Sequence, residues 1–178
     1  AKDIRDTLSG SYLWEKNDTR PLQDPLSFRT TVFVLNEAKR DLANAQQMLS
    51  IQMNSSDDNP AVILDASQEY ADNSQVKQYY VQGKDIKGAI YPSANFEPLP
   101  LALAVEHLSL SLAHLSHNSV QRTLHLSDDH FTGLSRFLTA KDNAGHAFGA
   151  IQKPQVALHS EIVDLANPVS LDGQVMAG

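Results

Sequence analysis

The stretch that decides the fold is residues 99–124, LPLALAVEHLSLSLAHLSHNSVQRTL. Apolar side chains recur in it at spacings of three and four, which predicts an amphipathic α-helix with one apolar face. That face carries Leu101, Val105, Leu108, Leu112 and Leu115, followed by Ser119. The helix would be about twice the usual length in globular proteins. Such a length favours an elongated helical bundle, in which the apolar face packs against other helices.

Two further helices are predicted on either side of this stretch. The first covers residues 27–53, with Asp41 outside an apolar stripe. That stripe consists of Val34, Ala38, Leu42, Ala45, Leu49 and Gln52. Turn-forming residues 54–60 then end the helix. The second covers residues 144–165, where Pro154 should kink the helix or mark a break.

The segment between the helix at residues 27–53 and the helix at residues 99–124 is not expected to be a long helix. It is irregular over residues 61–95, with two short strands predicted at residues 62–64 and 78–81. The predicted fold is therefore all-α: a long-helix bundle with a small irregular or short-strand insertion near 61–95. We expect residues 1–178 to form a single partial domain.

Composition limits the classes of function. A hydrophobic fraction of 42% and a charged fraction of 20% are ordinary for a globular protein. The net charge of −7 argues against nucleic-acid binding. Cysteine is absent, so disulfides and thiolate chemistry are excluded and a cytoplasmic location is expected. No apolar run approaches the roughly 20 residues of a membrane span, so no membrane partner is expected.

The segment Gln23-Asp24-Pro25-Leu26-Ser27-Phe28-Arg29 is the first candidate for function. Asp24 is a candidate helix N-cap, and Pro25 suits a first helical turn. Arg29 would then lie near the positive end of the helix, which is unfavourable unless an anion is close. That anion could be a substrate carboxylate. The alternative is a surface arginine paired with Asp24.

For each of the other polar clusters, a purely structural role stands as an alternative to a functional one. The acidic turn before Pro60 lacks the ligand pattern of a calcium loop, so a solvated turn is expected. Glu97 could be a general acid or base, or a carboxylate at the start of a helix. The histidines lack the spacing of a zinc site, so no metal is expected and they are interpreted as surface or interhelical residues. These are His107, His114, His117, His125 and His130.

Four motifs, taken in order, resemble those of the histidine, phenylalanine and tyrosine ammonia-lyases. Residues 23–29 resemble Q-D-P-Y-S-L-R, and residues 58–60 resemble D-N-P. Residues 94–100 are similar to G-N-F-x-x-x-P, and residues 160–172 to S-E-N-K followed by H-P-A-S-V-D. The resemblance covers nearly the whole chain from about Pro21.

This resemblance implies an aromatic amino-acid ammonia-lyase, with histidine as the favoured type of substrate. Such enzymes eliminate ammonia to give an α,β-unsaturated acid and are homotetramers of long helices. They use 4-methylideneimidazol-5-one, which forms from an Ala-Ser-Gly tripeptide. By position, Arg29 would bind the substrate carboxylate, Gln23 and Asn59 would hydrogen-bond around the cofactor and substrate, and Phe96 would lie near the substrate.

The sequence departs from the family pattern at two points. Ala-Ser-Gly does not occur in it, and its one Ser-Gly pair, Ser9-Gly10, follows Leu8. Leu26 replaces the family tyrosine, and leucine cannot transfer a proton. We therefore expect an internal fragment that is inactive alone and self-associates through its apolar faces. An aminomutase and a non-catalytic helical scaffold remain alternatives.

Overall fold

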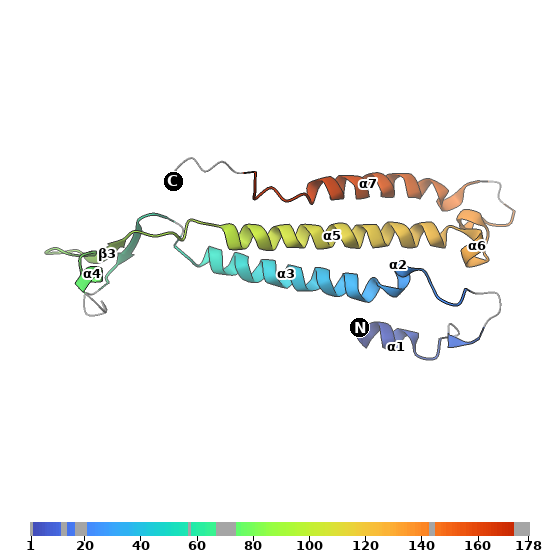
Figure 1. The fold of residues 1–178 in the computed structure, drawn as a ribbon, viewed down its shortest axis with the longest axis horizontal. Helices are drawn as coiled ribbons and strands as arrows, with labels where there is room; N and C mark the ends of the chain where they lie inside the picture. The colour runs from blue at the N-terminus through green and yellow to red at the C-terminus, as the bar shows by residue number, and fades with distance from the viewer. Residues whose placement is uncertain are drawn as a thin grey trace. The chain divides into compact units, whose positions relative to one another are not determined.

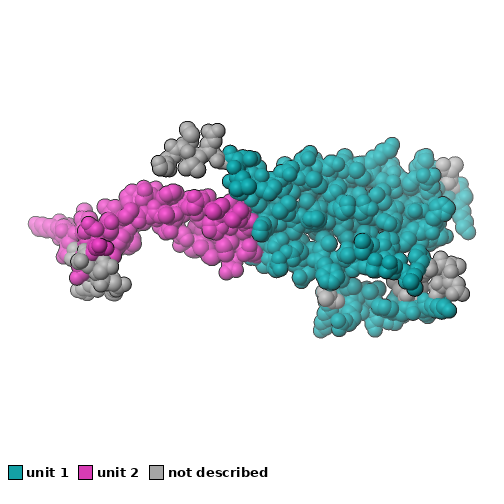
Figure 2. All heavy atoms as spheres, in the orientation of Figure 1, with its two compact units in different colours: residues 1–43, 105–178 teal, residues 44–104 magenta. Residues whose placement is uncertain are grey.

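The computed structural model describes residues 2–11, 14–16, 21–56, 58–66, 74–142 and 145–172. The chain forms two compact units, shown in teal and magenta in Figure 2. Unit 1 contains residues 1–43 and 105–178, and unit 2 contains residues 44–104. Whether the chain is a single partial domain of a larger enzyme stays a prediction.

Long helices dominate the chain, which confirms the all-α prediction. The helical elements are α1 (Lys2–Leu8), α2 (Leu26–Arg29), α3 (Thr31–Met53), α4 (Ser74–Lys77), α5 (Leu99–Leu126), α6 (Asp129–Thr132), the 3-10 helices η3 (Arg136–Leu138) and η4 (Ala147–Ile151), and α7 (Gln152–Leu165). Within unit 1, α5 lies between α3 and α7 (Figure 1). It therefore contributes side chains to contacts on both sides.

The boundaries of the predicted helices agree with the structure except at two points. The helix predicted over residues 27–53 is interrupted at Thr30, which separates α2 from α3. The helix predicted from residue 144 becomes regular α-helix only at Gln152, after η4. Pro154 thus falls in the first turn of α7, where its missing N–H costs no helical hydrogen bond. The proline marks a boundary there and is not the site of a kink.

The buried face of α3 agrees only in part with the one that the sequence predicts. Ala38 and Ala45 are buried as expected, but so is Asp41, which is only 9% exposed. Leu42 and Leu49, assigned to the apolar stripe, are each 47% exposed. Small side chains on the inner face let neighbouring elements approach closely, and this turns the larger leucines outward. The leucines of α3 are consequently available for packing against something else.

Helix α5 is long and apolar enough to cross a membrane by length and composition alone. It is not an uninterrupted apolar run, because Glu106 and several serine and histidine residues interrupt it. A mostly buried core helix of a water-soluble protein passes the same test, whereas 17% of the apolar window of α5 is buried within the described chain. Glu106 and Arg122 on α5 make hydrogen bonds to other parts of unit 1.

Unit 2 contains a three-stranded antiparallel sheet with the order β1-β3-β2. Its strands are β1 (Ala61–Leu64), β2 (Tyr80–Gln82) and β3 (Lys87–Tyr91). The two predicted strands correspond to β1 and β2, whereas the central strand β3 was not predicted. In the register, Ala61 pairs with Tyr91 and Tyr80 pairs with Ala89. The sheet therefore depends on the strand whose sequence signal is weakest.

Candidate functional site

The motif at residues 23–29 forms the short helix α2 and the turn before it. The N-cap is Pro25, and no side chain caps the helix, so the prediction that Asp24 is the N-cap is wrong. Because α2 has only four residues, Arg29 lies in its single turn, and the long helix α3 begins two residues later, at Thr31.

Arg29 is held by the main chain of its own motif. Its Nε donates to the Asp24 carbonyl oxygen at 2.8 Å. The partner is thus a backbone carbonyl, where the alternative interpretation expected the Asp24 carboxylate. Nη1 and Nη2 have no hydrogen-bond partner among the described residues, and the side chain is exposed. This geometry leaves the paired donors of the guanidinium available to a carboxylate.

Helix α2 is fixed to α5 by a polar network. Arg122 Nη1 donates to Thr31 Oγ1 and to Asn118 Oδ1, each at 2.8 Å. Thr31 Oγ1 in turn lies 2.8 Å from the Ser27 carbonyl oxygen, to which it donates. Asn118 is 6% exposed, so this network is largely shielded from water. It sets the position of α2 from residues about ninety positions further along the chain.

A cavity of about 280 Å³ lies beside α2 and is called the motif cavity below. It is lined by Leu26, Ser27, Thr30, His117, Asn118, Gln121 and His125. Two of these residues, Leu26 and Ser27, belong to the motif itself. Ser27 is 8% exposed, and its hydroxyl has no hydrogen-bond partner among the described residues.

The predicted residues of unit 2, Asn59 and Phe96, lie in two turns of the chain. Asn59 Oδ1 accepts from the Ser93 backbone N–H at 2.9 Å, which joins the turn at residues 58–60 to the turn before α5. Phe96 follows in that second turn and is 53% exposed. Glu97 Oε1 accepts from the Leu99 backbone N–H at 3.0 Å, so this carboxylate caps the start of α5. That contact supports the structural interpretation of Glu97.

The predicted site residues therefore fall into two groups. Gln23, Leu26 and Arg29 are exposed in unit 1, while Asn59 and Phe96 lie in unit 2. Their roles in binding substrate or cofactor stay predictions.

Glu106 is a polar anchor that the sequence analysis missed. Its Oε1 accepts from the backbone N–H groups of Val169 and Ser170 at 2.8 and 2.7 Å, and its Oε2 accepts from the Ser170 hydroxyl at 2.9 Å. The hydrogen bonds from Ser170 are the main reason that the pKa of Glu106 is lowered. A signal was present, because Glu106 is the one acidic residue between residues 99 and 126.

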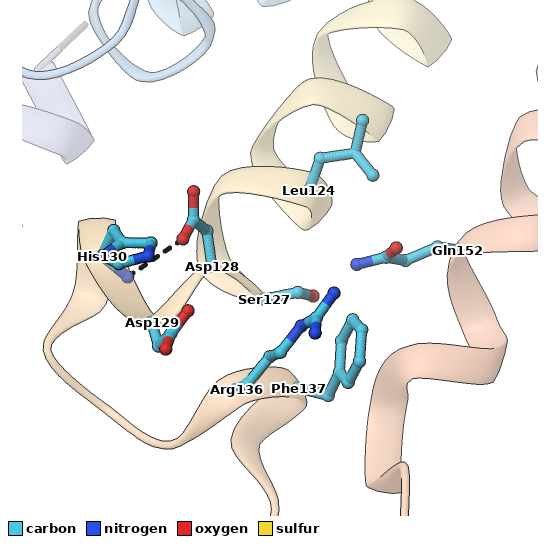
Figure 3. Close-up of a pocket in the computed structure, with 8 residues that line it drawn as sticks. All are labelled: Leu124, Ser127, Asp128, Asp129, His130, Arg136, Phe137 and Gln152. Atoms are coloured by element: carbon cyan, nitrogen blue, oxygen red, sulfur yellow. Dashed lines mark hydrogen bonds between the residues drawn. The ribbon is translucent and has the colours of Figure 1, made fainter.

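A larger cavity, of about 530 Å³, lies beside α6 (Figure 3). Asp128 caps α6 there by accepting from the His130 backbone N–H. The Arg136 guanidinium lies 4.7 Å from the centre of the Phe137 ring and is directed towards Gln152 (Figure 3). None of the residues predicted to bind substrate or cofactor lines this cavity.

Histidines link α5 to α7. His117 Nδ1 lies 3.4 Å from His159 Nε2, and His159 Nδ1 lies 2.9 Å from Ser116 Oγ. This pair confirms the interhelical interpretation for His117. Within the described ranges, no group of three or more histidine, aspartate or glutamate side chains is arranged to hold a metal ion.

Comparison with known families settles what kind of protein this is. The family model described as "Aromatic amino acid lyase" matches residues 1–178. The chain belongs to the aromatic amino acid lyase family. This confirms the family assigned from the four motifs.

Curated relatives of this aromatic amino acid lyase chain include histidine ammonia-lyases. That of Chloroflexus aurantiacus is 28% identical over 174 residues, which are 97% of this chain and 30% of the relative. That of Stigmatella aurantiaca is 27% identical over 173 residues, with the same coverage of both chains. The chain thus spans about a third or less of the length of the curated relatives that it matches.

A solved structure in the same family is also similar. It is the ergothioneine-degrading enzyme ergothionase from Treponema denticola, in complex with desmethyl-ergothioneine sulfonic acid. The identity is 35% and the TM-score is 0.68, over 93% of this chain and 29% of that one. The match agrees with a helical core shared among aromatic amino acid lyases.

Proposed function

We propose that this chain is part of a carbon–nitrogen lyase that eliminates the amino group from an aromatic L-amino acid, with histidine as the favoured substrate type. Membership of the aromatic amino acid lyase family supports the reaction class, and the histidine ammonia-lyase relatives support the substrate. The observation that carries the proposal is Arg29, whose guanidinium is fixed through Nε while Nη1 and Nη2 remain available to a carboxylate.

The chain supplies part of the environment of the cofactor but none of its atoms. Ala-Ser-Gly is absent from the sequence, so the tripeptide that forms 4-methylideneimidazol-5-one would lie elsewhere in the whole protein. When bound, that group supplies an electrophile that turns the amino group into a leaving group. Gln23 is exposed two residues before Pro25, and its amide can donate and accept hydrogen bonds there. We expect the isolated chain to be inactive, and the whole protein to be a cytoplasmic homotetramer that binds neither nucleic acid nor a membrane.

The experiment compares the full-length protein with its Arg29→Met variant in an ultraviolet assay for the unsaturated acid. The variant should retain the fold and raise KM for histidine at least about tenfold, because it removes a charged hydrogen bond to the carboxylate. Arg40→Met is the matched control, since Arg40 is exposed and pairs with Glu37. An unchanged KM in Arg29→Met would contradict the assignment, and no product from histidine, phenylalanine or tyrosine would contradict the function.

A second candidate is elimination from an imidazole betaine. One observation favours it: the 35% identity to ergothionase. A quaternary nitrogen has no lone pair to react with an electrophile, and it leaves as a neutral amine when the C–N bond breaks. Assaying ergothioneine beside histidine would separate the candidates. A β-amino acid product would instead indicate an aminomutase, and a folded protein with no product from any substrate would indicate a scaffold.

A further inference from the structure

We propose that the cavity beside α6, called the α6 cavity below, is a second binding site that takes a free α-amino acid with an apolar side chain. The Arg136 guanidinium and the Gln152 amide bind the carboxylate of this ligand, and the Asp129 carboxylate binds its ammonium group. The α6 cavity shares no lining residue with the motif cavity. The inference therefore does not rest on the proposed function and goes beyond it.

The Arg136 guanidinium is available to an anion. Its side chain is exposed and has no hydrogen bond or ion pair with any residue that the structure describes. It lines the α6 cavity and is directed towards Gln152, which reaches the cavity from α7 (Figure 3). The N–H donors of a guanidinium lie in one plane, and two of them match the two oxygens of a carboxylate. The Gln152 amide adds a further donor.

An aromatic ring holds this guanidinium in place. The Arg136 Cζ lies 4.7 Å from the centre of the Phe137 ring, within the range of a cation–π contact. The ring is itself confined, because a Cβ added at Gly149 would lie 2.9 Å from one of its carbon atoms. The centre of the His146 ring lies 5.8 Å from that of Phe137. A guanidinium that is already oriented loses less side-chain freedom when an anion binds.

The backbone that carries Arg136 and Phe137 is strained. Phe137 has a φ of 57° and a ψ of 19°, and Leu138 has a φ of 56°. This left-handed region is rarely occupied by residues with a side chain, and residues held there gather at binding and active sites. The Phe137 N–H donates to the Ser127 carbonyl oxygen at 3.1 Å, which ties the strained turn to the residue that follows α5. The strain is an observation independent of the cavity itself.

The charges around the α6 cavity favour a zwitterion over a simple anion. Asp128 and Asp129 both line the cavity. The Asp128 carboxylate accepts from the His130 backbone N–H, whereas the Asp129 carboxylate has no hydrogen bond or ion pair within the described ranges. Two carboxylates repel a phosphate or another polyanion but attract an ammonium group. A free α-amino acid carries both charges, and Arg136 and Asp129 supply the opposite charge for each.

The volume and the walls of the α6 cavity suit a small molecule. Its volume of about 530 Å³ lies within the range of pockets that enclose such ligands, roughly 300–1,000 Å³. Leu124 and Phe137 are half-buried in its wall and provide apolar contacts for a side chain. All residues that line the cavity belong to unit 1, so the site lies within one compact unit. Leucine has the charges and the apolar side chain that the cavity requires.

Calorimetry with the full-length protein tests the site without requiring turnover. The probes are L-leucine, isocaproate, which lacks the ammonium group, and isoamylamine, which lacks the carboxylate. Each of the two analogues should bind at least about tenfold more weakly than L-leucine, because one charged interaction is lost.

Substitutions assign the two charges to their residues. Arg136→Met should weaken L-leucine binding at least about tenfold. Asp129→Asn should weaken L-leucine binding and leave isocaproate binding unchanged, because isocaproate has no ammonium group. Gln152→Leu should weaken the binding of both by a smaller factor, and it covers the case in which Arg136→Met does not fold. Arg40→Met is the matched control, since Arg40 is exposed and pairs with Glu37.

Three outcomes would overturn the inference. An absence of L-leucine binding at millimolar concentration would show that the free donors of Arg136 serve another contact. Equal affinities for L-leucine and isocaproate would remove the role of Asp129 and with it the amino acid. L-leucine binding that is lost in Arg29→Met but kept in Arg136→Met would place the ligand at the proposed active site. Conversely, L-leucine binding that depends on Arg136 in a protein that forms no unsaturated acid would support this site and contradict the proposed function.

Discussion

The residue with the most distinctive environment is Glu106, whose carboxylate accepts hydrogen bonds from Val169 and Ser170. These bonds lower the pKa of Glu106 below its usual value of 4.5, and they do so mainly through the backbone N–H of Ser170. A lowered folded-state pKa means that the carboxylate stabilises the fold above the unfolded value. That stabilisation is lost as the pH falls below 4.5 and through the folded-state pKa. Glu106 thereby holds the segment after α7 against α5.

Glu106→Gln should lower the Tm of the full-length protein at neutral pH by roughly a few degrees. Glutamine keeps one acceptor but loses the charge, and the hydrogen bonds to a charged acceptor are the stronger ones. The difference from the wild type should shrink as the pH is lowered below 4.5, where Glu106 becomes protonated. Thermal unfolding followed by circular dichroism over that pH range would measure it. Glu37→Gln, which affects an exposed pair with Arg40, is the control. A difference that stays constant with pH would refute the explanation.

For single residues, the sequence predicted the motif at residues 23–29 but not its contacts. Arg29 could be chosen as a candidate because the motif resembles one whose arginine binds a carboxylate. The hydrogen bond from Arg29 to the Asp24 carbonyl oxygen could not be predicted, because it depends on where α2 ends. Ser27 and His125 meet only through the packing of α2 against α5, and they lie 98 positions apart. No local pattern carries that information.

Helices were predictable where the apolar side chains recur with a strong helical period. The helix predicted over residues 99–124 ends two residues before α5 does, because the apolar spacing is sustained over many turns. The sequence predicted the inward positions of Ala38 and Ala45 in α3 but not the exposure of Leu42 and Leu49, since alanine is as apolar as leucine in a pattern but packs more closely. Strand β3 was missed because Lys87 and Gly88 open it, and neither residue type favours strands.

Gly88 in β3 offers a test of how the sheet is built. A Cβ at this position would lie 2.6 Å from the Ile63 carbonyl oxygen, a contact with backbone that cannot move aside cheaply. Gly88→Ala should therefore weaken the pairing of β1 with β3, at a cost of about 1–3 kcal/mol. Hydrogen exchange of the amides in β1 and β3 would show it as faster exchange.

Gly83→Ala is the matched control for that substitution. A Cβ at Gly83 would lie 3.6 Å from the Ile86 carbonyl oxygen, which is an ordinary contact. Exchange in the sheet should stay close to that of the wild type. Equal effects of the two substitutions, or none for Gly88→Ala, would show that β1 and β3 do not pair with this register.

For the molecule as a whole, the main feature is that its buried side chains are small while many of its large apolar side chains are exposed. The buried apolar residues of the described part are alanines and Val120, and no large side chain there is fully buried. Leucines of α5 are exposed instead, among them Leu110 at 41% and Leu112 at 46%. Large apolar patches seldom remain open to water in monomers. In the homotetramer proposed above, we expect other parts of the protein to cover such surfaces.

The isolated 178-residue chain should therefore self-associate. Light scattering coupled to size exclusion, at micromolar concentration, should give a mass well above 19.5 kDa. Substituting both Leu110 and Leu112 with lysine should lower that mass, because a charge at each of these exposed positions opposes the burial of that side chain against another copy of the chain. Leu22→Lys is the control, since Leu22 is fully exposed and lies outside the helices. A wild-type chain that elutes as a monomer would show that these leucines do not drive assembly. The tetramer proposed for the whole protein would then need its contacts from other segments.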